Sequence, residues 1–131
     1  MRKYSVSIVL LVLCLGLWLS SSGCASSKQS ATVQGEYTLS SINGKNPELD
    51  NVTLKLTNKD IYGNGPINLW QASFEYGKVG PMIVTRRGGP PHEMQFESNL
   101  LSSLEGSTLE TVEDELIFSK SGSKIIFIKT E

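Results

Sequence analysis

The chain is poor in cysteine and histidine, which limits the sites that it can build. Its 131 residues include two cysteines, Cys14 and Cys24, and one histidine, His92. Structural zinc sites take four ligands, mostly cysteine and histidine, so the sequence predicts neither a metal site nor a bound cofactor. A catalytic histidine needs a positioned partner, and the spacing supplies none. We expect His92 to be a solvated surface residue.

Long apolar runs and blocks of like charge are also scarce. The main apolar run, residues 8–19, is shorter than the roughly 20 residues that cross a bilayer as a helix. The formal net charge is −1, and no basic cluster exceeds Arg86-Arg87. The sequence therefore disfavours a permanent transmembrane helix, and it lacks the basic surface typical of nucleic-acid-binding proteins.

What the sequence does have is a secretion signal that ends at Cys24. Arg2 and Lys3 form a positive start, the apolar run follows, and residues 20–23 are all small. This order is that of a signal peptide, and a cysteine directly after the small residues indicates a bacterial lipoprotein signal. Ser21 stands where such signals usually have leucine. The alternative is an ordinary signal peptide that is cleaved near a cysteine.

Lipidation of Cys24 is the favoured interpretation, because it removes a thiol that would otherwise stay unpaired in an oxidising compartment. Cys14 is a poor lipidation site because bulky Leu13 precedes it. A cysteine with two or three acyl chains would anchor the protein stably in a membrane. The expected location is the bacterial cell envelope, facing the periplasm. Ala25 favours the outer membrane if the cell is Gram-negative.

The chain divides into a signal, a tether and one domain. We expect residues 1–23 to be the signal peptide, 24–32 a flexible Ser-rich tether, and 33–131 a monomeric domain without a disulfide. Alternating apolar and polar residues separated by Gly, Asn and Pro predict short strands in this domain. The expected strands are 36–42, 52–57, 61–63, 70–76, 79–85, 109–112, 115–120 and 124–129.

One segment breaks the strand pattern. Pro90-Pro91 can open a helix and Gly106 can close it. At 100° per residue, the apolar side chains between them fall on one arc and the polar ones on the opposite arc. This predicts an amphipathic helix over about residues 91–105, laid on the sheet, with an apolar face made of Met94, Phe96, Leu100, Leu101 and Leu104.

Glu97 lies in the middle of this apolar arc. A carboxylate that faces a core must be paired, hydrogen-bonded or protonated, because unpaired burial is costly. The candidate partners are Arg86, Arg87 and the backbone amides of the turn 63–68. We expect Glu97 to tie the helix to the preceding turn and one of the two arginines to neutralise it.

The remaining site candidates lie in or beside this turn. Residues 63–68 are expected to form a turn that needs positive φ angles at its glycines, in which Asn68 bonds to backbone groups. Trp70 could line a ligand groove, but an aromatic residue on an alternating strand is more often core. Residues 86–91, with Arg86 and Arg87, could bind an anionic partner.

Taken together, several of these segments resemble the META domain family, which includes HslJ-type heat-shock proteins and many envelope lipoproteins. The resemblance rests on residues 35–39, 61–68, 85–87, 97–104 and 116–118. The family's opening Trp-x-Leu appears here as Tyr37-x-Leu39, and its cysteine pair is missing, so no disulfide is carried over. The resemblance implies an α+β fold, a mostly antiparallel, curled and partly barrel-like sheet with one helix across it. It implies no particular reaction.

These observations favour a lipid-anchored, non-enzymatic envelope protein that binds a small ligand or another envelope protein, or supports envelope homeostasis under stress. One alternative is an inhibitor-type module that presents residues 86–91 to an extracytoplasmic enzyme. A third hypothesis, from the enzyme class, is a hydrolase that uses His92 and Glu97. Their spacing disfavours it, because residues five apart face different sides of a helix.

Overall fold

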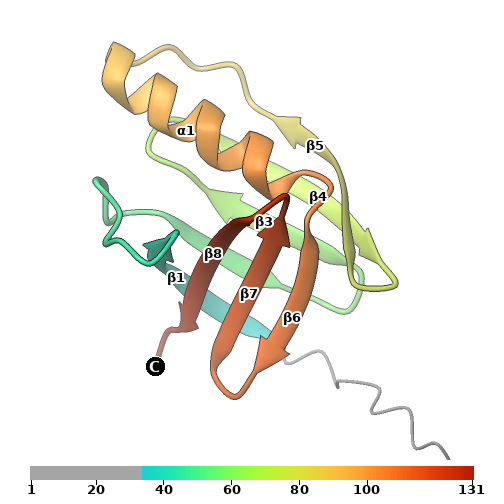
Figure 1. Ribbon diagram of the computed structural model, residues 1–131. Helices are drawn as coiled ribbons and strands as arrows, with labels where there is room; N and C mark the ends of the chain where they lie inside the picture. The colour runs from blue at the N-terminus through green and yellow to red at the C-terminus, as the bar shows by residue number, and fades with distance from the viewer. Residues whose placement is uncertain (1–33) are drawn as a thin grey trace, which may run out of the picture.

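The computed structural model describes residues 34–131, which form a closed antiparallel barrel of eight strands and one helix (Figure 1). The predicted signal peptide, Cys24 and the tether lie outside the described residues. Among residues 34–131, no helix is long and apolar enough to cross a bilayer. The elements are β1 (Gly35–Ile42), β2 (Thr53–Leu56), β3 (Asp60–Asn64), β4 (Leu69–Glu75), β5 (Lys78–Val84), α1 (Pro91–Leu104), β6 (Thr108–Val112), β7 (Glu115–Lys120) and β8 (Ser123–Lys129).

Each strand of the barrel pairs with the next along the chain, and β1 closes the ring by pairing with β8. Tight turns with positive φ connect several of these neighbours, as at Tyr76-Gly77 between β4 and β5 and at Ser121-Gly122 between β7 and β8. Two successive left-handed residues match the twist of a hairpin, which explains the glycine at the second position of each turn. The expected fold class, an antiparallel and curled sheet with one helix, is confirmed, and the barrel is closed rather than partial.

The barrel interior holds the hydrophobic core. Inward positions alternate along the strands, as in β2, where Leu54 and Leu56 are buried and Thr53 and Lys55 are exposed. The buried apolar residues come from the strands, from Val52 and from the helix, and they form one cluster. Because residues 34–131 contain all eight paired strands and this whole cluster, they constitute a complete folding unit.

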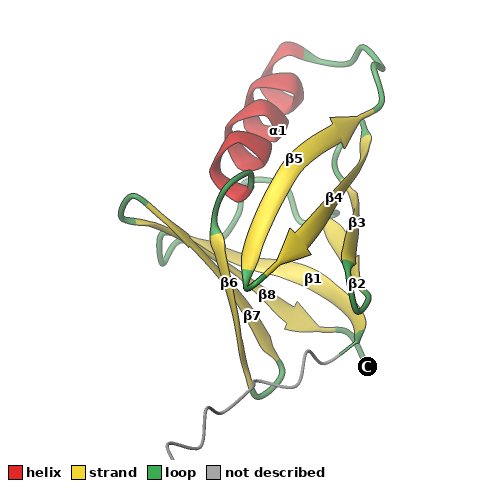
Figure 2. Ribbon diagram, turned by 90° about the vertical axis from the view of Figure 1, so that its right-hand side faces the viewer, coloured by secondary structure: helices red, strands yellow, loops and turns green. Residues whose placement is uncertain are grey.

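The helix α1 closes one end of the barrel (Figure 2). Leu100, Leu101 and Leu104 are buried in the core, as their arc predicts. The strands β5 and β6 pair at only one position, Lys78 with Thr108, so the sheet opens beside the helix. Helix α1 therefore belongs to the core at the place where the ring of strands is weakest.

Helix α1 starts and stops at the predicted residues, and a side chain from β7 holds its C-terminal end. Pro91 occupies the first turn and Gly106 follows the last turn with a φ of 74°, as expected for a helix start and stop. From β7, the Lys120 ammonium donates hydrogen bonds to the carbonyls of Ser102 (2.8 Å) and Glu105 (2.6 Å). A cation at this position satisfies free carbonyls and complements the helix dipole. The helix is thereby held at a defined position over the barrel.

Two predictions from the apolar periodicity are wrong, the burial of Met94 and the extension of a strand to residue 76. Met94 is 47% exposed, because it lies in the first turn of α1, which extends beyond the edge of the barrel. Tyr76 is fully exposed, because the strand β4 ends at Glu75 and Tyr76 enters the hairpin turn with a φ of 52°. In both cases the apolar periodicity continues past the end of the packed surface.

Candidate functional site

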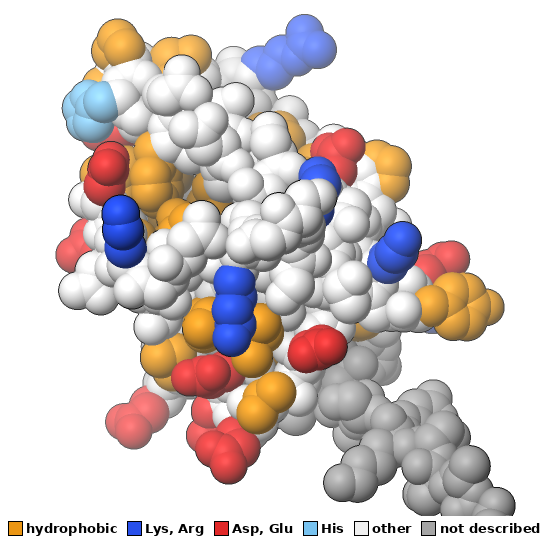
Figure 3. Space-filling model, in the orientation of Figure 1, with side chains coloured by type: hydrophobic (Ala, Val, Ile, Leu, Met, Phe, Trp, Pro, Cys, Tyr) orange, Lys and Arg blue, Asp and Glu red, His pale blue; other side chains and the backbone are white. Residues whose placement is uncertain are grey.

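A groove of about 630 Å³ runs between helix α1 and segment 42–48, the connection that follows β1. Its floor is apolar, made by Ile42, Phe96, Leu100 and Ile125. Leu100 and Ile125 are buried core residues, so the floor is the outer surface of the barrel's own packing. Apolar side chains are visible in the hollow below the helix in Figure 3. The groove is thus a preformed feature of the fold.

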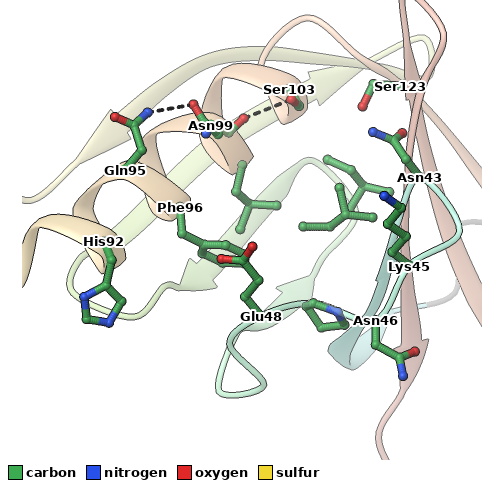
Figure 4. A pocket seen from close by; sticks show the side chains of 14 residues that line it. Asn43, Lys45, Asn46, Glu48, His92, Gln95, Phe96, Asn99, Ser103 and Ser123 are labelled. Atoms are coloured by element: carbon green, nitrogen blue, oxygen red, sulfur yellow. Dashed lines mark hydrogen bonds between the residues drawn. The ribbon is translucent and has the colours of Figure 1, made fainter.

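The rim of this groove is polar and rich in side-chain amides. On the helix, Gln95, Asn99 and Ser103 follow one another at intervals of four residues (Figure 4). The Gln95 amide donates to the Asn99 side-chain oxygen (3.0 Å), and the Ser103 hydroxyl donates to the Asn99 carbonyl (2.9 Å). We call these three residues the polar ladder. They are held in a row by their own hydrogen bonds.

Segment 42–48 forms the opposite wall. It contributes Asn43, Lys45, Asn46 and Glu48 to the rim and Pro47 to the lining. The segment is fixed at its start, where the Asn43 side-chain oxygen accepts a hydrogen bond from the Lys124 amide (2.8 Å). The isolated bridge between Ile42 and Lys45 tightens the turn. One lysine and one glutamate on this wall leave the rim without a dominant charge.

On the far side of α1, Glu97 joins the helix to the β3–β4 turn. Its carboxylate is 4% exposed and accepts hydrogen bonds from the backbone amides of Ile67 (3.3 Å) and Asn68 (2.8 Å) and from the Asn68 side-chain amide (2.6 Å). The Asn68 side-chain oxygen in turn accepts from the Thr85 hydroxyl (2.9 Å) and the Arg87 amide (2.8 Å). We call this group the Glu97–Asn68 network. It links the helix, the turn and the segment that precedes the helix.

Two glycines make room for this arrangement. A Cβ on Gly65 would lie 2.2 Å from the Glu97 Oε1 atom, and a Cβ on Gly63 would lie 1.8 Å from the Trp70 ring. The predicted reason for these glycines, positive φ angles, is wrong, because neither is among the residues with positive φ. Glycine is required at these two positions because the Glu97 carboxylate lies against the backbone of Gly65 and the Trp70 indole lies against that of Gly63.

The predicted arginine partner of Glu97 is also wrong. Within the described part of the chain, neither Arg86 nor Arg87 forms an ion pair, and both are exposed. N–H groups of the β3–β4 turn donate hydrogen bonds to the Glu97 carboxylate instead. The backbone amides of this turn were the other predicted partners. Only the backbone of Arg87 enters the network, through its bond to Asn68.

Trp70 is 3% exposed and packs on Gly63 of the neighbouring strand, away from the residues that line the groove. Its indole N–H has no hydrogen-bond partner among the described residues. Trp70 is therefore a core residue, as its place on an alternating strand predicts, and it does not line the groove beside α1.

His92 and Glu97 do not share a site. The His92 side chain is 74% exposed on the groove side of the helix, where its Nε2 atom lies 3.8 Å from Glu93. Glu97 is buried against the β3–β4 turn. Across residues 34–131, no three His, Cys, Asp or Glu side chains gather as a metal-binding group. The geometry offers a binding groove and a structural network.

Sequence reasoning missed the groove itself. It assigned Gln95, Asn99 and Ser103 to the solvent face of the helix and gave no role to segment 42–48. The sequence does contain the side-chain amides that form the rim of the groove, those of Asn43, Asn46, Gln95 and Asn99. Their convergence could not be foreseen, because it depends on how the first strand places its following segment beside a helix fifty residues later.

Comparison with known proteins agrees with this fold. A sequence model of the META domain matches residues 30–131. One protein with a solved NMR structure superposes with a TM-score of 0.57 at 15% identity, over 72% of this chain and 88% of that one. The NMR structure of a protein from Burkholderia xenovorans gives 0.56 at 17% identity, over 73% and 81%. No curated protein matches the chain. Since the family match covers the whole described barrel and its helix, the chain belongs to the META domain family.

Proposed function

We propose that this protein is a lipid-anchored protein of the bacterial cell envelope whose META domain is a non-enzymatic binding module. In this proposal Cys24 carries the acyl chains, residues 24–32 form the tether, and the domain faces the periplasm. The groove between α1 and segment 42–48 holds the ligand. The single observation that carries the binding role is this groove of about 630 Å³ with an apolar floor and a polar rim.

Groove size and composition support this role. Ligand sites are typically concave, of about 300–1,000 Å³, and mostly apolar, with a few polar groups that fix orientation. The groove is built on rigid elements, since its floor is the barrel core and the C-terminal end of α1 is held by Lys120. Both oxygens of the buried Glu97 carboxylate accept hydrogen bonds from N–H donors, three in all. This supports a structural role for Glu97 rather than acid–base catalysis.

Anchoring is tested by metabolic labelling of the full chain in a bacterial host with an alkyne-bearing fatty acid. The wild-type chain and a Cys14→Ala variant should both take up the label and fractionate with membranes. Cys24→Ala should lose the label and leave the membrane fraction. A Cys24→Ala variant that still incorporates fatty acid would remove the lipid anchor from the proposal.

Binding is tested with an isotope-labelled fragment spanning residues 30–131, to which fractions of envelope extract are added. A ligand of the groove should shift the NMR signals of Lys45, Asn46 and Asn99. The hairpin residues Glu113 and Asp114, which do not line the groove, serve as the internal reference. If every fraction leaves the groove signals unchanged, or shifts only signals elsewhere, the binding role is refuted.

A second candidate function, the inhibitor-type module, is favoured by one observation. Segment 86–90 is exposed, yet the Arg87 amide is bonded to Asn68 and Gly89 packs on Ile67. An exposed segment with a fixed backbone suits an inhibitory loop, because little order is lost on binding. Inhibition of an extracytoplasmic enzyme that persists unchanged in an Arg86→Ala/Arg87→Ala variant would eliminate this candidate.

A further inference from the structure

The polar ladder on α1 repeats at the spacing of an extended polypeptide. Residues four apart on a helix are about 6 Å apart along its axis. Alternate residues of an extended chain are about 6.6 Å apart. Gln95, Asn99 and Ser103 therefore lie at intervals that match the peptide groups on one side of an extended segment. From Gln95 to Ser103 the ladder covers about 12 Å, the length of roughly four extended residues.

The ladder can hydrogen-bond to peptide groups without losing its own bonds. After Gln95 donates to Asn99, the Gln95 side-chain oxygen remains as an acceptor and the Asn99 amide nitrogen remains as a donor. Ser103 donates to the Asn99 carbonyl and keeps its acceptor lone pairs. A peptide backbone presents the complementary set, alternating N–H donors and C=O acceptors. Figure 4 shows the three side chains in a row along the helix.

The floor fits an apolar side chain. Phe96 and Leu100 of the helix meet Ile42 and Ile125 of the barrel directly beside the ladder. Three of these four residues are aliphatic, which suits an aliphatic side chain better than the ring of a sugar, for which stacked aromatic faces are the usual partner. Alternate side chains of an extended segment would point toward this floor and away from it.

The position of the groove favours a ligand from the aqueous side over a membrane lipid. The start of β1 and the C-terminus lie at the end of the barrel away from α1 (Figures 1 and 2). If Cys24 is the anchor, residues 25–33 can extend about 30 Å from the membrane surface. An anchor attached at that end of the barrel leaves α1 and the groove accessible from the periplasm.

We infer that the groove binds a short extended peptide of about four residues, with its backbone on the polar ladder and one apolar side chain on the floor of Phe96, Leu100, Ile42 and Ile125. This inference rests on the proposed binding role of the groove and names its ligand class. Lys45 and Glu48 bring opposite charges to the rim, so binding should depend little on the net charge of the peptide or on salt concentration.

The test titrates blocked tetrapeptides into the isotope-labelled fragment 30–131, which contains the complete barrel. Acetyl-Ala-Leu-Ala-Ala-amide should shift the groove signals with a Kd below about 1 mM. Replacing leucine by glutamate should weaken binding at least about tenfold, because a carboxylate would then face the apolar floor. Methylating the peptide nitrogens should weaken it similarly, because the backbone donors are lost.

Matched variants separate the ladder from the fold. Asn99→Ala should weaken binding about 5- to 10-fold, the cost of one to two hydrogen bonds. Ser98→Ala, at the neighbouring exposed position that does not line the groove, should bind like the wild type. Both substitutions are on exposed residues, and the NMR spectrum of each variant reports directly whether it is folded.

Three outcomes would overturn the inference. If no peptide shifts the groove signals while a disaccharide, a short-chain lipid or an envelope fraction does, the groove binds another class of ligand and the binding role stands. If neither peptides nor the other probes shift these signals, both the peptide inference and the proposed binding role fail. Equal binding of the leucine, glutamate and N-methylated peptides would also refute the peptide arrangement described.

Discussion

The Glu97–Asn68 network makes a specific prediction for Glu97→Gln. In the wild type, all three donors that reach the carboxylate are N–H groups. A glutamine oxygen can still accept from the Ile67 and Asn68 backbone amides. Its NH₂ group, however, must then face the NH₂ group of Asn68, and neither can accept. Asn68 cannot rotate to help, because its oxygen already accepts from Thr85 and Arg87.

The expected cost follows from these contacts. Leaving a buried donor unsatisfied costs about 1–3 kcal/mol, and bonds to a charged acceptor are worth roughly 1 kcal/mol more than neutral ones. Glu97→Gln should therefore lower the free energy of unfolding by about 2–4 kcal/mol. Glu93→Gln is the matched control. It lies one turn earlier on the same helix, its side chain is 29% exposed, and its only ion pair within residues 34–131 is the 3.8 Å contact with His92. That change should cost less than about 0.5 kcal/mol.

A double variant tests the geometry itself. In Glu97→Gln/Asn68→Asp the charge moves to residue 68, where the new carboxylate accepts from the glutamine NH₂, from the Thr85 hydroxyl and from the Arg87 amide. Asn68→Asp alone places two carboxylates face to face and should destabilise strongly. The double variant should recover at least about 1 kcal/mol relative to the sum of the single changes.

The assay is urea unfolding of the fragment 30–131, followed by circular dichroism and repeated on the wild type and the four variants. A domain of this size has about 5–15 kcal/mol of stability, so the predicted losses leave it folded and measurable. Glu97→Gln as stable as the wild type would refute the argument. So would a double variant whose loss equals the sum of the two single losses, since the partners would then be energetically independent.

Further predictions follow from individual contacts. Gly65→Ala should lower the free energy of unfolding by about 1–3 kcal/mol, because its Cβ would lie 2.2 Å from Glu97. Gly88→Ala has open space around its Cβ and should be near neutral, and urea unfolding compares the two variants. Lys120→Met should cost about 1 kcal/mol and speed amide exchange at the end of α1, while Lys124→Met should change neither. Burial, with a smaller contribution from the Asp114 charge, raises the pKa of Tyr37 above its ordinary value of 10.0. The stability that the neutral phenol contributes is thus fully present below about pH 10 and is lost as the pH rises through the raised pKa. Tyr37→Phe should therefore lose less stability than the wild type at alkaline pH. Identical pH profiles of unfolding for the two proteins would contradict this.

The strands and the helix could be predicted because their determinants are local. Alternation in β2 and β4, turn sequences such as Asn43-Gly44, and the proline and glycine that bound α1 all act over a few residues. The errors at Met94 and Tyr76 have one cause: a periodic pattern does not reveal where the surface that it packs against ends.

The candidate site could be predicted only in part, because it depends on contacts between distant segments. Burial of Glu97 could be inferred from its place on the helix, yet the choice between arginines and backbone amides rests on the path of the β3–β4 turn. The spatial requirement for Gly65 and the meeting of segment 42–48 with α1 are likewise set by tertiary structure. No local pattern encodes them.

The pairing of β1 with β8 has a consequence for how the protein is made. The first strand of the domain remains without one of its two neighbours until residues up to Lys129 have emerged. A chain that is threaded across a membrane from its N-terminus therefore cannot close its barrel partway through export. Ring closure between segments almost the whole domain apart makes folding slow relative to local hairpin formation. Until then β1 lacks a strand partner, so if the chain is exported as proposed, the interval between translocation and folding is when it is most exposed to aggregation and proteolysis.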